Sequence, residues 1–366
     1  MRLLVITFEL DEKHPALAWQ VYVVRELSRC CEKVLVLTSR ISKDIDLPAN
    51  VEVIIPPVRP LGVPHRFGGR WAFNFEMNQL LRKNAIDAVF IHMAMEWGYI
   101  LCPTFKHLKL PTVMWYAHGT VTKRLKLAIQ CVDKVVTSTP EGCRVDSKKI
   151  KVIGQAINTS LFSIPERRDL QTILYVGRIS RRKRVDLLYQ VYKSLRKDLS
   201  HAEISSFDVI GMPLTDDDMH YEQDIKQIIK EQNDFDKFRM RGFVPFSDLP
   251  VYYRKSFLHI NVSETGSMDK TVMEALSCGC PVLTSNPAFR EILSDYPEFF
   301  ISDEHPDAIA EQVLTIYNRR SQYDPLALRA LVLNDHGLDT YAQRVLSVFD
   351  DITREKDQKY TSRVNH

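Results

Sequence analysis

The sequence lacks any apolar run long enough to cross a membrane. A helix that spans a bilayer needs about 20 consecutive apolar residues, and the runs here are much shorter. The apolar start, Leu3–Phe8, is also too short for a signal peptide and is followed by charged residues. We therefore expect a cytoplasmic protein that contacts a membrane only peripherally, on the inner face of the cytoplasmic membrane.

Cysteine is scarce as well. The 7 cysteines among 366 residues are odd in number and show no metal-ligand spacing. Cys278 and Cys280 stand within apolar runs and are expected to be free core thiols, as in a reducing compartment. The sequence therefore predicts neither a disulfide framework nor a metal site.

Several common nucleotide-binding motifs are missing. No Gly-x-Gly-x-x-Gly follows the first apolar run, which argues against an NAD-dependent dehydrogenase, and no Walker lysine loop occurs. The basic residues are scattered and match no known nucleic-acid-binding module. We expect no nucleic-acid partner.

Charge is distributed unevenly along the chain. Residues 1–165 contain 22 Lys and Arg against 14 Asp and Glu, whereas residues 166–366 contain 27 against 32. A basic first half suits an acidic partner or a phospholipid surface. Pro60–Trp71 and Lys123–Lys126 would form a basic and aromatic rim for such a surface. A merely solvated basic face is the alternative.

Short apolar runs alternate with helical patterns through most of the chain. Runs of Val, Ile and Leu between amphipathic helices are typical of parallel strands buried on both faces. The predicted strands are Leu3–Phe8, Lys33–Thr38, Val51–Ile55, Ala88–His92, Thr112–Tyr116 and Lys134–Ser138, then Thr172–Val176, Ser206–Ile210, Phe238–Phe243, Leu258–Val262 and Val282–Ser285. The pattern predicts an α/β fold of two doubly wound, Rossmann-like domains.

Turn residues around Asn158–Asp169 separate the two patterns. We therefore expect one domain over residues 1–165, a second over 166–337, and a C-terminal helix and tail over 338–366. The helix, predicted for Leu338–Asp351, follows the completed second sheet and is expected to return to the first domain. The last dozen residues are expected to be loose.

Two strand-to-helix loops in the second half have unusual chemistry. Gly177 follows a predicted strand, and Arg178 and Lys183 behind it form a basic pair suited to a diphosphate. In the second loop, Gly266 and Ser267 precede a helix whose positive end favours phosphate. Glu274, one turn into that helix, would accept hydrogen bonds from ribose hydroxyls. The alternatives are a solvated basic loop and a capped helix with an exposed Glu274.

Two loops of the first half also follow predicted strands. His118 comes after the strand Thr112–Tyr116, although a lone histidine is more often structural than catalytic. Ala16 stands in the first loop, where its small side chain would let a bound group approach the first helix. Both loops would lie at the ligand-binding edge of a doubly wound sheet.

Taken in order, these segments resemble the retaining family-4 glycosyltransferases of the GT-B fold, over nearly the whole chain. The matching segments are His14–Leu17, Trp115–Gly119, Gly154–Asn158, Gly177–Lys183, Gly242–Pro245, and Gly266–Glu274 with its Ala-Leu-Ser-Cys-Gly-Cys-Pro tail. The resemblance implies two domains facing across a cleft, the first binding an acceptor and the second a nucleotide sugar.

The resemblance also implies a role for each segment. Arg178 and Lys183 would hold the donor diphosphate, Glu274 would hold its ribose, and His118 would lie near the transferred sugar. The other donor-binding residues are then Ala16, Gly177, Phe243, Val244, Gly266, Ser267, Asp269, Lys270, Thr271 and Val272. The implied activity moves a hexose from a UDP-sugar, or a GDP-sugar, to a hydroxyl of a glycan or lipid-linked acceptor, as in the synthesis of cell-envelope polysaccharide.

One position departs from the family pattern. The family commonly has two glutamates spaced by seven residues, whereas Gly266 stands eight positions before Glu274 here. We assign the sugar-hydroxyl contact to Asp269 instead. We expect no metal and no cofactor beyond the nucleotide sugar, because the basic pair stabilises the leaving group and no Asp-x-Asp motif stands in the expected place.

Two other activities compete with this interpretation. A catalytically silent accessory subunit of the same fold is favoured by the missing glutamate and opposed by the basic pair. A sugar-nucleotide epimerase would need acid and base side chains around the anomeric carbon, which the sequence does not assemble.

Overall fold

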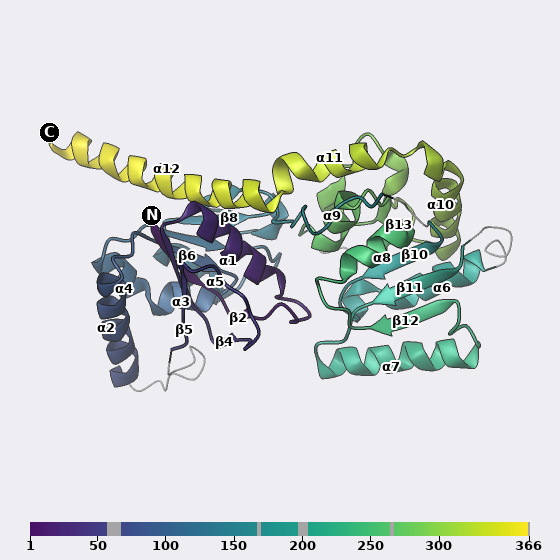
Figure 1. The fold of residues 1–366 in the computed structure, drawn as a ribbon, viewed down its shortest axis with the longest axis horizontal. Coiled ribbons are helices and arrows are strands. Elements are labelled where there is room, and N and C mark those ends of the chain that lie inside the picture. The colour runs from purple at the N-terminus through teal and green to yellow at the C-terminus, as the bar shows by residue number, and fades with distance from the viewer. Residues whose placement is uncertain (57–66, 167–169, 197–203, 264–266, 365–366) are drawn as a thin grey trace. The chain divides into compact units, whose positions relative to one another are not determined.

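The computed structural model describes residues 1–56, 67–166, 170–196, 204–263 and 267–364. They form two units, one of Met1–Ala156 with Leu338–His366 and the other of Ile157–Gly337 (Figure 1). The second unit begins before the boundary at residue 166 that the turn residues indicated. The reason is that Ile157 pairs with Gly337, and Phe162 is fully buried in the core of the second unit.

The first unit is built on a parallel sheet of seven strands in the order β5-β3-β1-β6-β7-β8-β9. Its strands are β1 (Arg2–Ile6), β3 (Lys33–Leu37), β5 (Val51–Ile54), β6 (Ala88–His92), β7 (Thr112–Trp115), β8 (Lys134–Thr137) and β9 (Ile150–Val152), with β2 (Glu9–Leu10) and β4 (Arg40–Ile41) as a separate pair. Its helices are α1 (Trp19–Cys30), α2 (Phe67–Lys83), α3 (Met95–Ile100), α4 (Cys102–His107), α5 (Lys123–Cys131) and α12 (Leu338–Val364). Leu3–Ile6 of the interior strand β1 are fully buried, as the continuous apolar run predicts.

The long C-terminal helix α12 belongs to the first unit, which confirms the predicted return (Figure 1). It contacts α1, β7 and β8, and its buried residues recur at helical spacing: Tyr341, Ala342, Val345, Val348, Phe349 and Ile352. The ring of Tyr341 packs edge-on against Trp115 of β7. The last dozen residues, 355–366, were expected to be loose, but α12 continues through them as far as Val364. Ion pairs such as Lys134–Glu355 hold the helix to the sheet beyond its apolar stripe.

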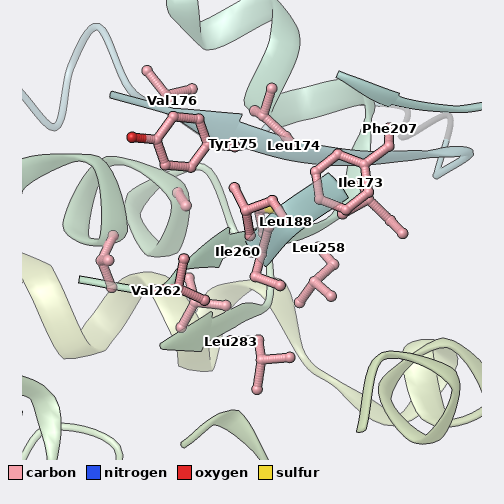
Figure 2. Close-up of a cluster of buried hydrophobic side chains, with 14 of the residues drawn as sticks. Ile173, Leu174, Tyr175, Val176, Leu188, Phe207, Leu258, Ile260, Val262 and Leu283 are labelled. Carbon is pink, nitrogen blue, oxygen red and sulfur yellow. The ribbon is translucent and has the colours of Figure 1, made fainter. Parts of the chain in front are cut away.

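The second unit repeats the pattern with a parallel sheet of five strands in the order β12-β11-β10-β13-β14. Its strands are β10 (Thr172–Val176), β11 (Ser206–Ile210), β12 (Phe238–Gly242), β13 (Ser256–Asn261) and β14 (Val282–Thr284). Its helices are α6 (Val185–Leu195), α7 (Asp216–Glu231), α8 (Leu249–Lys255), α9 (Lys270–Ser277), α10 (Pro306–Arg319) and α11 (Pro325–His336). In its core, Tyr175 of β10, Leu188 of α6 and Ile260 of β13 belong to one buried cluster (Figure 2). The predicted α/β class with two doubly wound domains is confirmed.

Glycines bring the ends of three neighbouring strands close together. The N–H of Gly177 donates to the carbonyl of Ile210 (3.0 Å), and the N–H of Gly211 donates to the carbonyl of Gly242 (2.9 Å). Gly211 has a φ of +143°, and a Cβ atom added to it would lie 1.8 Å from the carbonyl oxygen of Gly177. The loop that carries Arg178 therefore depends on the absence of a side chain at position 211.

This close approach predicts different effects for two similar substitutions. Gly211→Ala should lower the free energy of unfolding of the second unit by about 2–4 kcal/mol, because the new Cβ would collide with the backbone. Gly242→Ala is the matched control. Its φ is also positive, at +73°, but no atom lies within 4 Å of an added Cβ, so a loss of only about 1 kcal/mol is expected. Equal losses in urea titrations of the two variants would contradict this explanation.

Candidate functional site

The predicted donor-binding residues of the second unit gather at one edge of its sheet. Because all five strands are parallel, their carboxyl ends meet at the same edge, which we call the carboxyl edge. Gly177 and Arg178 follow β10, Phe243 and Val244 follow β12, and Lys270 begins α9 shortly after β13 ends. Gly266 lies outside the described residues. The loops that the sequence selected are therefore neighbours in the fold.

A network of hydrogen bonds around Asp269 connects three of these loops. Lys183 donates to Asp269 Oδ1 (2.8 Å) and to the hydroxyl of Ser263 (3.0 Å). The other oxygen, Asp269 Oδ2, accepts from the side-chain amides of Asn261 (3.2 Å) and Asn286 (3.3 Å). The lysine and the carboxylate are both mostly buried. The loops after β10, β13 and β14 are thereby linked through one carboxylate.

Arg178 is held by a different acidic residue. Its Nε donates to Asp218 Oδ2 (2.7 Å), and one terminal nitrogen makes a second, shorter contact with the same oxygen. Asp218 is buried at the start of α7, where it forms a capping box with Thr215. Burial acts to raise the pKa of the Asp218 carboxyl, but the hydrogen bonds from Arg178, Thr215 and Leu214 together hold that pKa below its ordinary value. The arginine is thus fixed at one end while its side chain stays partly exposed.

Helix α9 begins at the carboxyl edge without a side-chain cap from Asp269. Asp269 occupies the N-cap position, but its carboxylate makes no hydrogen bond to the first turn of the helix, because it points to Lys183 and the two asparagines. The backbone N–H groups of Lys270, Thr271 and Val272 form this first turn. The Val272 side chain is fully buried, so only its backbone is available for a ligand. A helix N-terminus of this kind favours an anion.

Glu274 is buried, so the alternative of a simply exposed Glu274 is wrong. Its side chain lies one turn into α9, is only 3% exposed, and accepts a hydrogen bond from the hydroxyl of Tyr253 (3.1 Å). Burial raises the pKa of Glu274 to about 7, against the opposing effects of Lys270 and Tyr253. Burial also lowers the pKa of Lys270 to about 7, and Glu274 opposes that shift. The start of α9 therefore carries two side chains that titrate near neutral pH.

The other two predicted residues lie in the first unit. His118 follows β7 at the carboxyl edge of the first sheet, is exposed, and has its ring centroid 6.1 Å from that of Tyr116. Ala16 is exposed in the first loop, where its N–H donates to His14 Nδ1 (3.0 Å). His14 also accepts from the N–H of Leu17 (2.9 Å), so this ring fixes the loop before α1. The roles of His118 and Ala16 remain predictions.

Sequence reasoning missed the residues that hold the site in place. Asn261 and Asn286 look like ordinary polar ends of apolar strands, and Tyr253 looks like one more aromatic in a helix. Asp218 had a usable signal, because Thr215 stands three residues before it, as in a capping box. These residues stand between 8 and 40 positions along the chain from the groups they orient.

Two structural features are absent from the described residues. Within them, no group of three or more His, Cys, Asp or Glu side chains is arranged to hold a metal ion. None of the helices in the described ranges is both long and apolar enough to cross a bilayer.

Comparison with known proteins connects this geometry to a family. Residues 157–329 match the family model for glycosyl transferases group 1. The matched residues make up most of the second unit, Ile157–Gly337. The match includes Arg178, Lys183, Asp269 and Glu274. A comparison with curated sequences gives no match.

Several solved structures share the fold of the whole chain. HepE from Anabaena, solved in complex with UDP, has a TM-score of 0.73 at 13% identity and covers 96% of this chain and 100% of its own. Sucrose-phosphate synthase from Thermosynechococcus elongatus has a TM-score of 0.70 at 15% identity. The similarity covers 97% of this chain and 99% of the synthase chain. WaaG, a glycosyltransferase involved in lipopolysaccharide biosynthesis, has a TM-score of 0.64 at 14% identity. The similarity covers 95% of this chain and 99% of the WaaG chain.

These similarities establish the fold as GT-B, with two Rossmann-like domains, as the sequence predicted. At sequence identities of 15% or less, these structures establish only the fold of this chain. The match to the group 1 family model over residues 157–329 is the finding that points to glycosyl transfer.

Proposed function

We propose that this protein is a retaining, metal-independent glycosyltransferase of family 4. It would move a hexose from a UDP-sugar, or a GDP-sugar, to a hydroxyl of a glycan or lipid-linked acceptor in the synthesis of cell-envelope polysaccharide. The observation that carries the proposal is the convergence of Arg178, Lys183, Glu274 and the start of α9 at one sheet edge, within the matched domain. That HepE was solved with UDP favours UDP as the nucleotide.

In the proposed reaction the protein stabilises a leaving group. The bond between the anomeric carbon and the diphosphate oxygen breaks, and the electron pair stays on the diphosphate. Arg178, Lys183 and the N–H groups at the start of α9 would stabilise this charge. The acceptor oxygen bonds to the anomeric carbon from the same face, and its proton passes to the departing phosphate oxygen. No metal or further cofactor takes part.

The remaining donor contacts follow from the chemistry of each group. Glu274 would accept hydrogen bonds from the ribose, and Asp269 from a sugar hydroxyl. Phe243, which is 40% exposed, and Val244 follow β12 and would line the base. Gly177 and Ser267 would bring the backbone close to the phosphates. His118 would position the transferred sugar, and Ala16 would leave room for it.

A catalytically silent subunit that only binds its partners is a second candidate. It is favoured by the pairing of both basic side chains with carboxylates, Arg178 with Asp218 and Lys183 with Asp269. Formation of free UDP or GDP from a nucleotide sugar by the purified protein would exclude it.

Removal of the basic pair is the direct test of the mechanism. Arg178→Ala/Lys183→Ala should reduce transfer by at least about a thousandfold, because two groups that stabilise the leaving diphosphate are lost. Arg182→Ala is the matched control, since Arg182 stands in the same turn but is exposed. Release of UDP or GDP from a panel of nucleotide sugars, assayed with a chelator present, measures the effect. Near-normal turnover by the double variant would refute the mechanism.

The two groups that titrate near pH 7 predict opposite pH dependences in matched variants. In Glu274→Gln only Lys270 titrates, so affinity for UDP-glucose should rise as the pH falls and the amine becomes charged. In Lys270→Met only Glu274 titrates, so affinity should fall as the pH falls and the carboxylate is lost. Each variant has lost the partner that opposed the pKa shift, so the midpoints should lie below about 7 for Lys270 and above about 7 for Glu274.

Calorimetric titrations between pH 6 and pH 8.5 would measure these slopes, and UDP-glucose is a suitable probe because its diphosphate does not titrate in this range. Slopes of the same sign in the two variants would contradict the assignment.

We also propose that the first unit contacts an anionic membrane surface peripherally, on the cytoplasmic side. Helix α5 buries Leu125 and Ala128 in the first core and exposes Lys123, Arg124 and Lys126. Leu127, which is 52% exposed, stands on the same helix. Of the predicted rim Pro60–Trp71, residues 60–66 lie outside the described residues; Trp71 is 80% exposed. A basic face with exposed apolar side chains suits a phospholipid surface.

Charge reversal tests this surface. Reversal of Lys123, Arg124 and Lys126 to Glu should weaken binding to anionic vesicles at low salt by about a hundredfold or more, at about 1 kcal/mol for each basic residue lost. The control reverses three exposed lysines of the second unit, Lys226, Lys230 and Lys237. Equal vesicle co-sedimentation of the two triple variants, or none by the unmodified protein, would rule the surface out.

A further inference from the structure

A polar pocket lies in the second unit, away from the candidate donor site. It has a volume of about 420 Å³ and lies between α8 and the sheet. Its lining residues are Thr172, Ser205, Ser206, Asp208, Arg239, Arg241, Asp248, Val251, Tyr252, Lys255 and Ser256. Pockets of this size are typical of small-molecule sites.

Most of the pocket lies toward the end of the sheet opposite to the carboxyl edge. Thr172, Ser206 and Ser256 are the first residues of β10, β11 and β13, whereas the candidate donor residues follow the last residues of the strands. A strand of five residues is about 13–17 Å long. The pocket is therefore a separate site, and its chemistry has to be explained on its own.

Asp208 is an unusual residue in the lining of this pocket. It stands in β11 with only 4% of its surface exposed, and its Oδ2 accepts the Nε–H of Arg241 (2.7 Å). The other oxygen, Oδ1, is buried and accepts no hydrogen bond from any described residue. A buried carboxylate oxygen without a donor is unfavourable, so a group that donates a hydrogen bond is expected beside it.

The charges around Asp208 restrict what that group is. Arg239, Arg241 and Lys255 also line the pocket, and three cations disfavour a metal ion or an amine. Asp208 and Asp248 in turn disfavour a phosphate. Hydroxyl groups are compatible with both the three cations and the two carboxylates, because a hydroxyl donates to a carboxylate and accepts from a guanidinium or an ammonium.

Arg241 is held in place for such a contact. Its guanidinium is fixed by Asp208 and lies 6.0 Å from the ring centroid of Tyr252. Its two terminal nitrogens donate no hydrogen bond to the described residues. Fixed donors beside a fixed acceptor, next to an aromatic ring, match the alternating hydroxyl and C–H surface of a sugar ring.

We propose that this pocket is a second carbohydrate site that binds a neutral sugar through its hydroxyl groups, without transferring it. Asp208 accepts from sugar hydroxyls, Arg241 and Lys255 donate to them, and Tyr252 provides an apolar wall. The proposal does not rest on the transfer reaction, because the pocket contains none of the residues assigned to the donor site.

The test is ligand-observed NMR of the full-length protein with glucose, galactose, mannose, maltose and lactose, each at millimolar concentration. All measurements use the Arg178→Ala/Lys183→Ala background, which separates this pocket from the donor site. Asp208→Asn should lower the affinity for the sugar that binds by about tenfold or more, because a charged hydrogen-bond acceptor is lost. Asp224→Asn, at an exposed position of α7, is the matched control and should bind unchanged.

A second variant covers the case in which Asp208→Asn does not fold. Val251 lines the pocket on α8 and is 47% exposed, so Val251→Trp should fill the pocket without disturbing the core and abolish binding. The proposal is overturned if no neutral sugar binds, or if binding survives in both Asp208→Asn and Val251→Trp. It is also overturned if inorganic phosphate or glycine, tested in parallel, binds in an Asp208-dependent way and the sugars do not.

Discussion

The arrangement of the candidate donor site depends on how the carboxylate of Asp269 is used. An aspartate at a helix N-cap usually accepts from the backbone of the first turn. Here the side chains of Lys183, Asn261 and Asn286 donate hydrogen bonds to its oxygens instead. One carboxylate thereby links the loops after β10, β13 and β14, and it leaves the positive end of α9 without a side-chain cap. The hydrogen bonds of Asp269 thus hold the loops together and also leave the N-terminus of α9 available to bind an anion.

Both basic side chains reach the site through carboxylates that are themselves fixed. Asp218 is held in the capping box of α7, and Asp269 is held by Asn261 and Asn286. Long side chains that are already ordered lose less conformational entropy when a ligand binds. A bound diphosphate would share Arg178 and Lys183 with the carboxylates of Asp218 and Asp269. These two carboxylates would therefore influence the affinity for the diphosphate as well as the positions of the two cations.

Much of the fold could be predicted because buried parallel strands are continuous apolar runs. Strand β10 coincides with the predicted Thr172–Val176, and β1 overlaps the predicted Leu3–Phe8 but begins one residue earlier. Segments whose environment depends on tertiary contacts were missed or misjudged. The two-residue strands β2 and β4 pair only with each other, and α12 continues past its apolar stripe because sheet lysines pair with its acidic residues.

The candidate site divides in the same way between what local sequence reveals and what it does not. Arg178, Lys183 and Glu274 stand in loops whose composition is visible, whereas Asp218 and Asp269 lie 40 and 86 residues from the basic groups they orient. The burial of Glu274 was the decisive property that the sequence could not give, since it depends on Tyr253 and the packing of α8 against α9. An exposed glutamate would remain ionised at neutral pH. A buried one next to a buried lysine retains its proton to about pH 7, so its packing, and not its residue type, determines how it would bind a ribose.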